Sequence, residues 1–180
     1  MMTNTVNVSK AEYTDNDEIS KFLVENHGHK ATENTWKKIF LHKWSNKNYF
    51  GYCLRNETNE IVGYFGLIFS ENNQYENLGY ANITSWCVNK NYRKHSMKLL
   101  NSAMQEKNYI LTSHSTTNEI LKIYFFKKWK ILDSKYNYFF FGLLPSFSNF
   151  QIHEINDTNF VFENLKNKKI YNDHKSYDCK

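Results

Sequence analysis

A histidine, a tyrosine and a glutamate are the side chains of this sequence best suited to acid–base chemistry. His114 ends a predicted strand, and because an imidazole titrates near neutral pH it is a candidate general base. A solvated or hydrogen-bonded strand-end histidine is the plainer interpretation. Glu76, in a polar loop, is a weaker candidate for the same role. Tyr124 lies on the apolar side of a predicted helix, where it is either a core aromatic residue or a general acid.

The three cysteines form no recognisable redox or metal-binding motif. Cys87 would need a histidine or aspartate beside it to act as a nucleophile, and the sequence fixes no such partner, so a small buried strand residue is favoured. An odd number of widely spaced cysteines without a CxxC pair favours reduced thiols in a cytoplasm. His27, His29 and His42 lack metal-ligand spacing with any cysteine, so we predict no metal site.

Residues 86–98 predict the end of a strand, a short loop and the start of a basic helix. The strand is predicted over 81–88, the loop over 89–94 and the helix over 96–107. Backbone N–H groups at a helix N-terminus have no partner within the helix and favour an anion. The formal net charge of +5, from 23 basic and 18 acidic residues, suits an anionic ligand such as a nucleotide. No dense basic run predicts a nucleic-acid partner.

These segments belong to a longer pattern of strands and helices. Turn residues at 56–59 predict an antiparallel hairpin, which precedes a βαβαβ unit. We therefore predict one α/β domain with a mixed sheet and helices on its faces. At 180 residues the chain is long enough for one such core and too short for two. The remaining predicted strands cover 6–13, 49–54, 61–69, 109–114 and 130–144. One further helix is predicted to start with Asp15 or Asp17 as its cap, and two more are predicted over 32–43 and 117–128.

The segment from residue 86 to residue 98 resembles the phosphate-binding segment of the GNAT superfamily of acyl-CoA N-acyltransferases. In that family a strand is followed by Arg/Gln-x-x-Gly-x-Gly/Ala at the start of a helix. Arg93 fits the first position, Ser96 replaces the first glycine, and Lys98 replaces the second small residue, where its ammonium either meets a phosphate or blocks the approach. The resemblance implies acetyl-CoA as co-substrate, bound by Trp86, Cys87, Val88, Arg93, Lys94, His95, Ser96, Met97 and Lys98.

Residues 118–133 are similar to the family's Asn…Tyr-x-x-x-Gly-Phe-x-x-Leu segment. Tyr124 falls on the tyrosine, Lys128 on the glycine and Trp129 on the phenylalanine. The resemblance implies that Tyr124 protonates the departing CoA thiolate. It also implies that Asn118, one residue closer to the tyrosine than usual, binds the pantetheine arm. A third landmark, the turn at 56–59 with the strand that follows, completes the family's order across residues 6–144.

The resemblance implies a GNAT-like acyltransferase domain over residues 1–148. Its sheet is expected to be mostly antiparallel, with a parallel, splayed pair formed by the strands at 81–88 and 109–114. A small primary amine is the implied acceptor. A narrower likeness, of residues 92–100 and of the tail at 170–180, to acyltransferases of surface-polysaccharide clusters favours an amino sugar, free or nucleotide-linked.

Residues 149–180 are predicted to be an extension that leads into further sequence of a longer protein. Its apolar pieces within 150–165 predict strands that pair with the domain or with a second subunit of a homodimer, followed by a mobile tail. No signal peptide and no apolar run long enough for a bilayer are evident, so we expect no membrane partner and a cytoplasmic location.

Two other functions stay open. Lys98 and Lys128, at positions where the family has small residues, also fit a catalytically inactive GNAT-like module that binds or scaffolds. A basic nucleic-acid-binding domain is the weaker alternative, because the sequence has no stacking platform with clustered arginines.

Overall fold

The structure, a computed structural model, describes residues 5–28, 30–41, 44–71 and 78–131, together with residues 168 and 172. The chain falls into two units that divide between Ile120 and Leu121, and each is described by itself. Glu76, most of the predicted strand at 130–144 and all but two residues of the extension at 149–180 lie outside the described residues.

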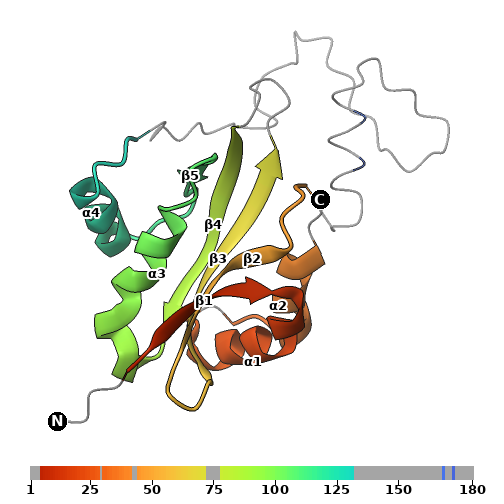
Figure 1. Cartoon of the computed structure of the whole chain (residues 1–180), viewed down its shortest axis with the longest axis vertical. Helices are drawn as coiled ribbons and strands as arrows, with labels where there is room; N and C mark the ends of the chain where they lie inside the picture. Colours follow the sequence, from red (N-terminus) through yellow and green to blue (C-terminus); the bar gives the residue numbers. More distant parts are fainter. Residues whose placement is uncertain are drawn as a thin grey trace, which may run out of the picture. The chain divides into compact units, whose positions relative to one another are not determined.

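The first unit contains a five-stranded sheet in the order β1-β2-β3-β4-β5 (Figure 1). The first three strand pairs are antiparallel, and β4 and β5 are parallel. The mixed sheet predicted from the hairpin and the βαβ pattern is therefore confirmed. The strands are β1 (Asn7–Glu12), β2 (Tyr49–Arg55), β3 (Ile61–Glu71), β4 (Gly79–Val88) and β5 (Tyr109–Thr112).

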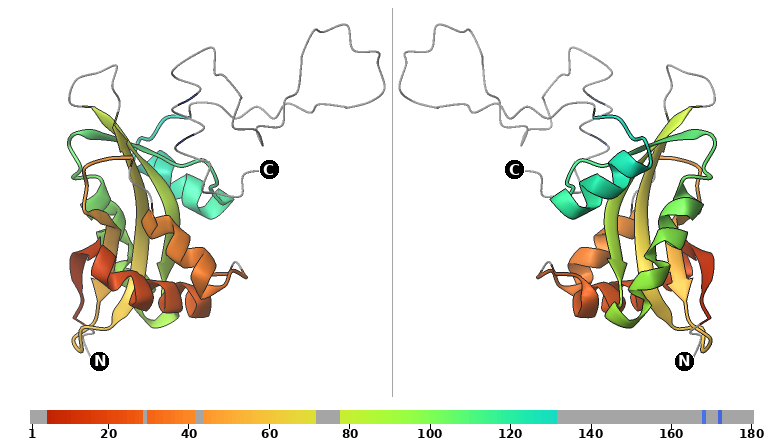
Figure 2. Two further views of the ribbon diagram at one scale, coloured as in Figure 1. Left: turned by 90° about the vertical axis from the view of Figure 1, so that its right-hand side faces the viewer. Right: turned by 90° about the vertical axis from the view of Figure 1, so that its left-hand side faces the viewer.

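Helices cover both faces of this sheet: α1 and α2 lie on one face and α3 on the other (Figure 2). The apolar side of α3 is formed by Leu99, Leu100 and Ala103, each with no exposed surface. Leu99 lies over Gly63 of β3, where a larger residue would meet it. The helices are α1 (Asn16–Asn26), α2 (Glu33–Lys37), α3 (Ser96–Ala103) and α4 (Asn118–Phe126).

Two helix predictions and one loop prediction are corrected by the structure. The helix predicted over 32–43 is a short α2 that continues as a 3₁₀ helix, Lys38–Leu41. The Thr32 side chain caps α2 by accepting a bond from the Thr35 N–H. The helix predicted over 96–107 ends at Ala103, and Met104, directly after it, is 41% exposed. The loop predicted over 89–94 is instead a 3₁₀ helix, Lys90–His95.

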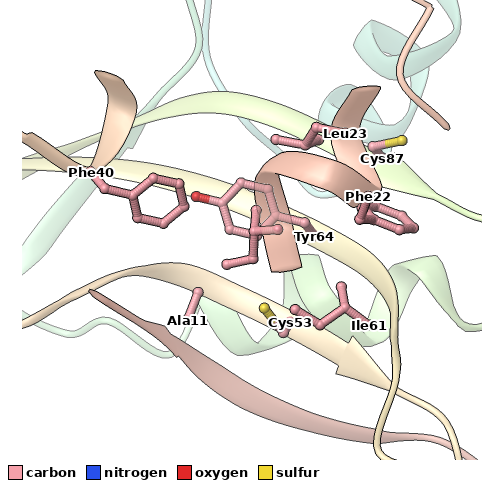
Figure 3. Close-up of a cluster of buried hydrophobic side chains, with 9 residues drawn as sticks. Ala11, Phe22, Leu23, Phe40, Cys53, Ile61, Tyr64 and Cys87 are labelled. Carbon is pink, nitrogen blue, oxygen red and sulfur yellow. The ribbon is translucent and has the colours of Figure 1, made fainter. Parts of the chain in front are cut away.

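The fully buried ring of Tyr64 lies at the centre of the core between the sheet and the helices α1 and α2 (Figure 3). Its hydroxyl donates to the Phe50 carbonyl oxygen at 2.8 Å, which satisfies the one polar group of this ring. Cys53 and Cys87 are its register partners in β2 and β4. The other members of the cluster are Ala11, Ile19, Phe22, Leu23, Phe40 and Ile61.

A bulge in β2 turns two tyrosines toward the same side. Gly51 has φ 125°, and the register with β1 shifts at this point. Tyr49 and Tyr52, three residues apart, would point to opposite faces of a regular strand. Both instead donate hydrogen bonds to the Glu106 carboxylate, which also pairs with Lys47 at 3.3 Å. Glu106 thus fixes the chain that follows α3 to β2, which accounts for the early end of that helix.

Arg55 joins the start of α1 to the β2–β3 hairpin. Its guanidinium contacts Asp15 at 2.8 Å and Glu18 at 3.0 Å and donates to the Asn59 carbonyl oxygen at 2.7 Å. The Asp15 side chain was a predicted cap of α1, but it accepts from the Glu12 N–H and from Arg55 instead.

Candidate functional site

The parallel pairing of β4 with β5 ends at Thr112, where β5 itself ends, and we call the β5 side of the remaining β4 residues, 83–88, the separated edge. The two strands pair only over Gly79–Asn82 of β4, although β4 continues to Val88 (Figure 1). Among the described residues, no strand pairs with the β5 side of residues 83–88. Within the described part of the chain, the backbone N–H and C=O groups on that side have no strand partner, and such groups suit a ligand that lies along the strand.

A β-bulge falls in this separated part of β4. Its register with β3 passes from Gly66↔Ser85 to Leu67↔Ile83, so that Thr84 is an extra residue. Bulges re-aim side chains and occur often beside functional sites. The bulge therefore lies just beyond the end of β5, in the part of β4 that no described strand pairs with on that side.

The three predicted strand residues of the site differ in their surroundings. Trp86 is half-buried and packs edge-on against Phe65, with ring centroids 5.4 Å apart. Val88 is half-buried beside Gly63. Cys87 points to the opposite face, is 7% exposed, and has its thiol pKa raised by burial to about 11. Such a thiol stays protonated at neutral pH, which agrees with its interpretation as a small buried residue.

The start of α3 follows β4 through the 3₁₀ helix Lys90–His95. Asn89 caps that turn, because its Oδ1 accepts from the Asn91 N–H at 3.1 Å. The Ser96 N–H, at the start of α3, donates to the Arg93 carbonyl oxygen. Ser96 and Met97 are half-buried at the first turn of α3. Donors for an anion at this point are therefore expected mainly from side chains.

Four exposed cations surround this helix start: Lys90, Arg93, Lys94 and Lys98. No Asp or Glu occurs between residues 77 and 105, and none of the four cations is in an ion pair with a described residue. Positive charge near a helix N-terminus is opposed by the helix dipole. These four positive charges therefore slightly destabilise the ligand-free helix, but they favour the binding of an anion at its start.

In the second unit, Tyr124 is 5% exposed and stacks on Trp129 with centroids 4.4 Å apart. The Trp129 N–H donates to the Tyr124 carbonyl oxygen at 3.0 Å, and the Lys128 N–H donates to the Phe125 carbonyl oxygen at 2.9 Å. These two bonds and the ring contact form a Schellman motif at the end of α4. Lys128 has φ 61°, the left-handed conformation that glycine adopts most readily.

The remaining predicted residues lie at element ends. His114 is exposed, two residues beyond the end of β5, and Asn118 is the exposed first residue of α4. Two groups of predicted residues lie on adjoining elements. Residues 86–88 end β4, and residues 93–98 cover the 3₁₀ helix that follows it and the start of α3. The prediction overlooked Thr84 and Ser85, although two hydroxyl residues in a strand that should be buried on both faces were a signal.

Among the described residues, no three His, Cys, Asp or Glu side chains gather as a metal site would require. In the same part of the chain, none of the helices is long and apolar enough to span a bilayer.

Comparisons with known proteins agree with this architecture. No family model and no curated protein sequence matches the chain. Solved structures do. Ribosomal-protein-alanine N-acetyltransferase from Brucella melitensis biovar Abortus 2308 has a TM-score of 0.54 at 12% identity, over 76% of this chain and all of that one. A transcriptional regulator from Bacillus halodurans C-125 has a TM-score of 0.54 at 18% identity, with the same coverage.

Glucosamine-6-phosphate N-acetyltransferase from Arabidopsis thaliana has a TM-score of 0.52 at 15% identity, over 76% of this chain and 99% of that one. At such identities the likeness establishes the fold alone. It is the GNAT-like fold predicted from the sequence, with a parallel β4–β5 pair in a mixed sheet.

Proposed function

We propose that this chain is an acetyl-CoA-dependent N-acetyltransferase that acylates the primary amine of a small acceptor. The observation that carries the proposal is that β4 continues beyond the end of β5, with no described strand beside residues 83–88, directly before the basic start of α3. A separated strand edge suits the amide groups of a pantetheine arm, and exposed unpaired cations suit phosphates. The GNAT-like fold of the similar acetyltransferases supports the same reaction class.

In this proposal the residues of the 93–98 segment bind the CoA phosphates. Arg93, Lys94 and Lys98 supply charge and donors to the phosphates at the first turn of α3, where the Ser96 N–H is already bonded within the chain. The separated edge of β4 from Ile83 to Val88 binds the thioester and the arm, and Asn118 contacts the arm. The pantetheine amides, the thioester and the phosphates thereby each meet groups of suitable chemistry.

The proposed reaction is a direct transfer. The acceptor nitrogen attacks the thioester carbon, the new N–C bond forms, and the C–S bond breaks. His114 takes the proton lost by the amine, and Tyr124 gives its phenolic proton to the departing thiolate. An amino sugar is the acceptor that we propose, supported by the narrower sequence likeness and by the similarity to a glucosamine-6-phosphate N-acetyltransferase. A cytoplasmic location and a homodimer are further parts of the proposal.

Ligand binding tests the first step. Acetyl-CoA and desulfo-CoA should each raise the melting temperature, because a ligand that binds only the folded state stabilises it by mass action. Lys98→Ala should weaken the affinity measured by calorimetry about five-fold, and more in low salt. Lys107→Ala, a loss of an exposed cation beyond the opposite end of α3, is the matched control and should leave the affinity unchanged. Equal affinities for the Lys98 variant and the wild type at low salt would refute this placement.

Turnover tests the second step. Tyr124→Phe keeps the ring on Trp129 but removes its acidic proton, so kcat should fall by about ten- to a hundred-fold with the acetyl-CoA affinity unchanged. Tyr13→Phe, at a 58% exposed tyrosine, is the control. An unchanged kcat in the Tyr124 variant would make that residue a packing residue only.

The inactive binding module is the second candidate, favoured by an exposed lysine, Lys98, at a position where the family has a small residue. It predicts acetyl-CoA binding without acetyl transfer to any primary amine, amino sugars included. Thiol release on an amine panel, together with a mass-spectrometric search for acetylated product, separates the two functions.

A further inference from the structure

The bulge in β4 brings two hydroxyl groups to one side of the sheet. Thr84 and Ser85 are successive residues, which point to opposite faces of a regular strand. Here a Cβ atom added to Gly66 would collide with Thr84 Oγ1 and would lie 2.8 Å from Ser85 Oγ. Both hydroxyls therefore lie over Gly66, whose missing side chain leaves them room.

The Ser85 hydroxyl has an unusual environment. Ser85 is 4% exposed, and its Oγ has no hydrogen-bond partner among the described residues. A buried hydroxyl without a partner is unfavourable in the ligand-free protein, and buried polar groups of folded proteins are rarely left so. Its neighbour Thr84 is only half-buried, so the pair of hydroxyls extends from the core toward the separated edge of β4.

Two more polar side chains lie on the same side. Asn82 pairs with Ile68 of β3. Because Ile68 is two residues from Gly66, the two lie on the same face of the sheet, and Asn82 shares that face. Its Oδ1 accepts a bond from the Thr112 hydroxyl of β5 at 3.3 Å. We call Asn82, Thr84, Ser85 and Thr112 the polar row. Neither β4 nor β5 contains a charged residue, so a ligand on this row meets hydrogen-bonding groups without net charge.

We propose that the polar row positions the acceptor, and this rests on the proposed function. The amine N–H groups donate to Thr84 Oγ1 and Ser85 Oγ, which leaves the nitrogen lone pair directed to the thioester carbon. Asn82 and Thr112 bind hydroxyl groups beside the amine. The row thus selects a primary amine on a hydroxylated, uncharged body, as in an amino sugar. Thr84 and Ser85 are positioning residues, and the bonds made and broken are those of the transfer above.

Variant kinetics with acetyl-CoA and glucosamine test the proposal. Thr84→Val keeps the shape of the side chain and removes the hydroxyl, and Ser85→Ala removes the other. Each should raise the KM for glucosamine about tenfold, with the acetyl-CoA affinity unchanged. Ser9→Ala is the matched control, because Ser9 Oγ is also buried without a partner among the described residues but lies on β1. An unchanged KM in both β4 variants would overturn the proposal, since a merely structural role would alter stability only.

Binding without turnover provides a second measurement. With desulfo-CoA bound, glucosamine should shift the NMR signal of the Thr84 methyl group, and Gly66→Ala should abolish this shift by filling the space under the hydroxyls. Acetyl-CoA binding with the Thr84 shift but no acetyl transfer would overturn the proposed function and support the polar row as a binding site. Acetyl transfer to glucosamine with no Thr84 shift would support the function and overturn the row.

Discussion

Replacing Lys128 by glycine should stabilise the end of α4. Lys128 has φ 61°, a conformation that costs an L-residue roughly 1–2 kcal/mol and costs glycine almost nothing. Glycine also makes the unfolded chain more flexible, which costs roughly 0.5–1 kcal/mol and reduces the stabilisation. The Lys128 side chain is exposed, so that little packing is lost. The net effect should be a stabilisation of about 0.5–1 kcal/mol, or about 1–4 °C in melting temperature for a chain of this size.

Urea denaturation measures this gain, and amide exchange of the Trp129 N–H reads it locally, because that group donates to the Tyr124 carbonyl oxygen in the same motif. Lys122→Gly is the matched control: the same substitution at an exposed site inside α4 should destabilise by about 1 kcal/mol. If Lys128→Gly destabilised as much as Lys122→Gly and exposed the Trp129 amide, the left-handed conformation at residue 128 would be refuted.

Three further predictions concern the first unit. Arg55→Met should lower the free energy of unfolding in urea by about 1–3 kcal/mol, because Asp15 would stay partly buried without its partner; an unchanged midpoint would contradict this. Burial raises the pKa of Glu106, but hydrogen bonds from the two β2 tyrosines and from a lysine outweigh it and hold the pKa below 4.5, so its stabilisation is present above pH 4.5 and is lost as the pH falls through the lower folded pKa. Glu106→Gln should therefore flatten the acid limb of the stability profile measured by thermal melts. Cys87→Ala should keep acetyl transfer intact, and the wild-type thiol, with a pKa of about 11, should react slowly with iodoacetamide at pH 8.

The strands could be predicted from the sequence because their signals are local. β2 and β3 are rich in aromatic and aliphatic residues, and the turn at 56–59 between them ends with Asn59 at φ 65°, as hairpin turns of this kind require. The parallel β4–β5 pair followed both from the βαβ pattern and from the family resemblance. The predicted splay of that pair stays a prediction. The core position of Cys87 followed from its place in a strand.

The corrections arise from tertiary contacts that no local pattern encodes. Helical periodicity continues past Ala103, but the bonds of Glu106 to Tyr49 and Tyr52 fix the chain to β2 and end α3 early. These contacts exist only because Gly51 allows a bulge that turns both tyrosines to one side. The bulge at Thr84 was overlooked for the same reason: a bulge is a property of two paired strands and not of one sequence segment.

The two lysines that depart from the family pattern have different physical meanings. Lys128 keeps the left-handed backbone that the family's glycine would adopt, so the chain retains that geometry at a local cost that ligand binding does not change. Lys98 adds an exposed cation to the first turn of α3, where the helix dipole and three other cations oppose it. A bound anion would offset that second cost. Lys128 is therefore uninformative about activity, whereas the affinity of the Lys98 variant for CoA decides whether the departure serves a ligand.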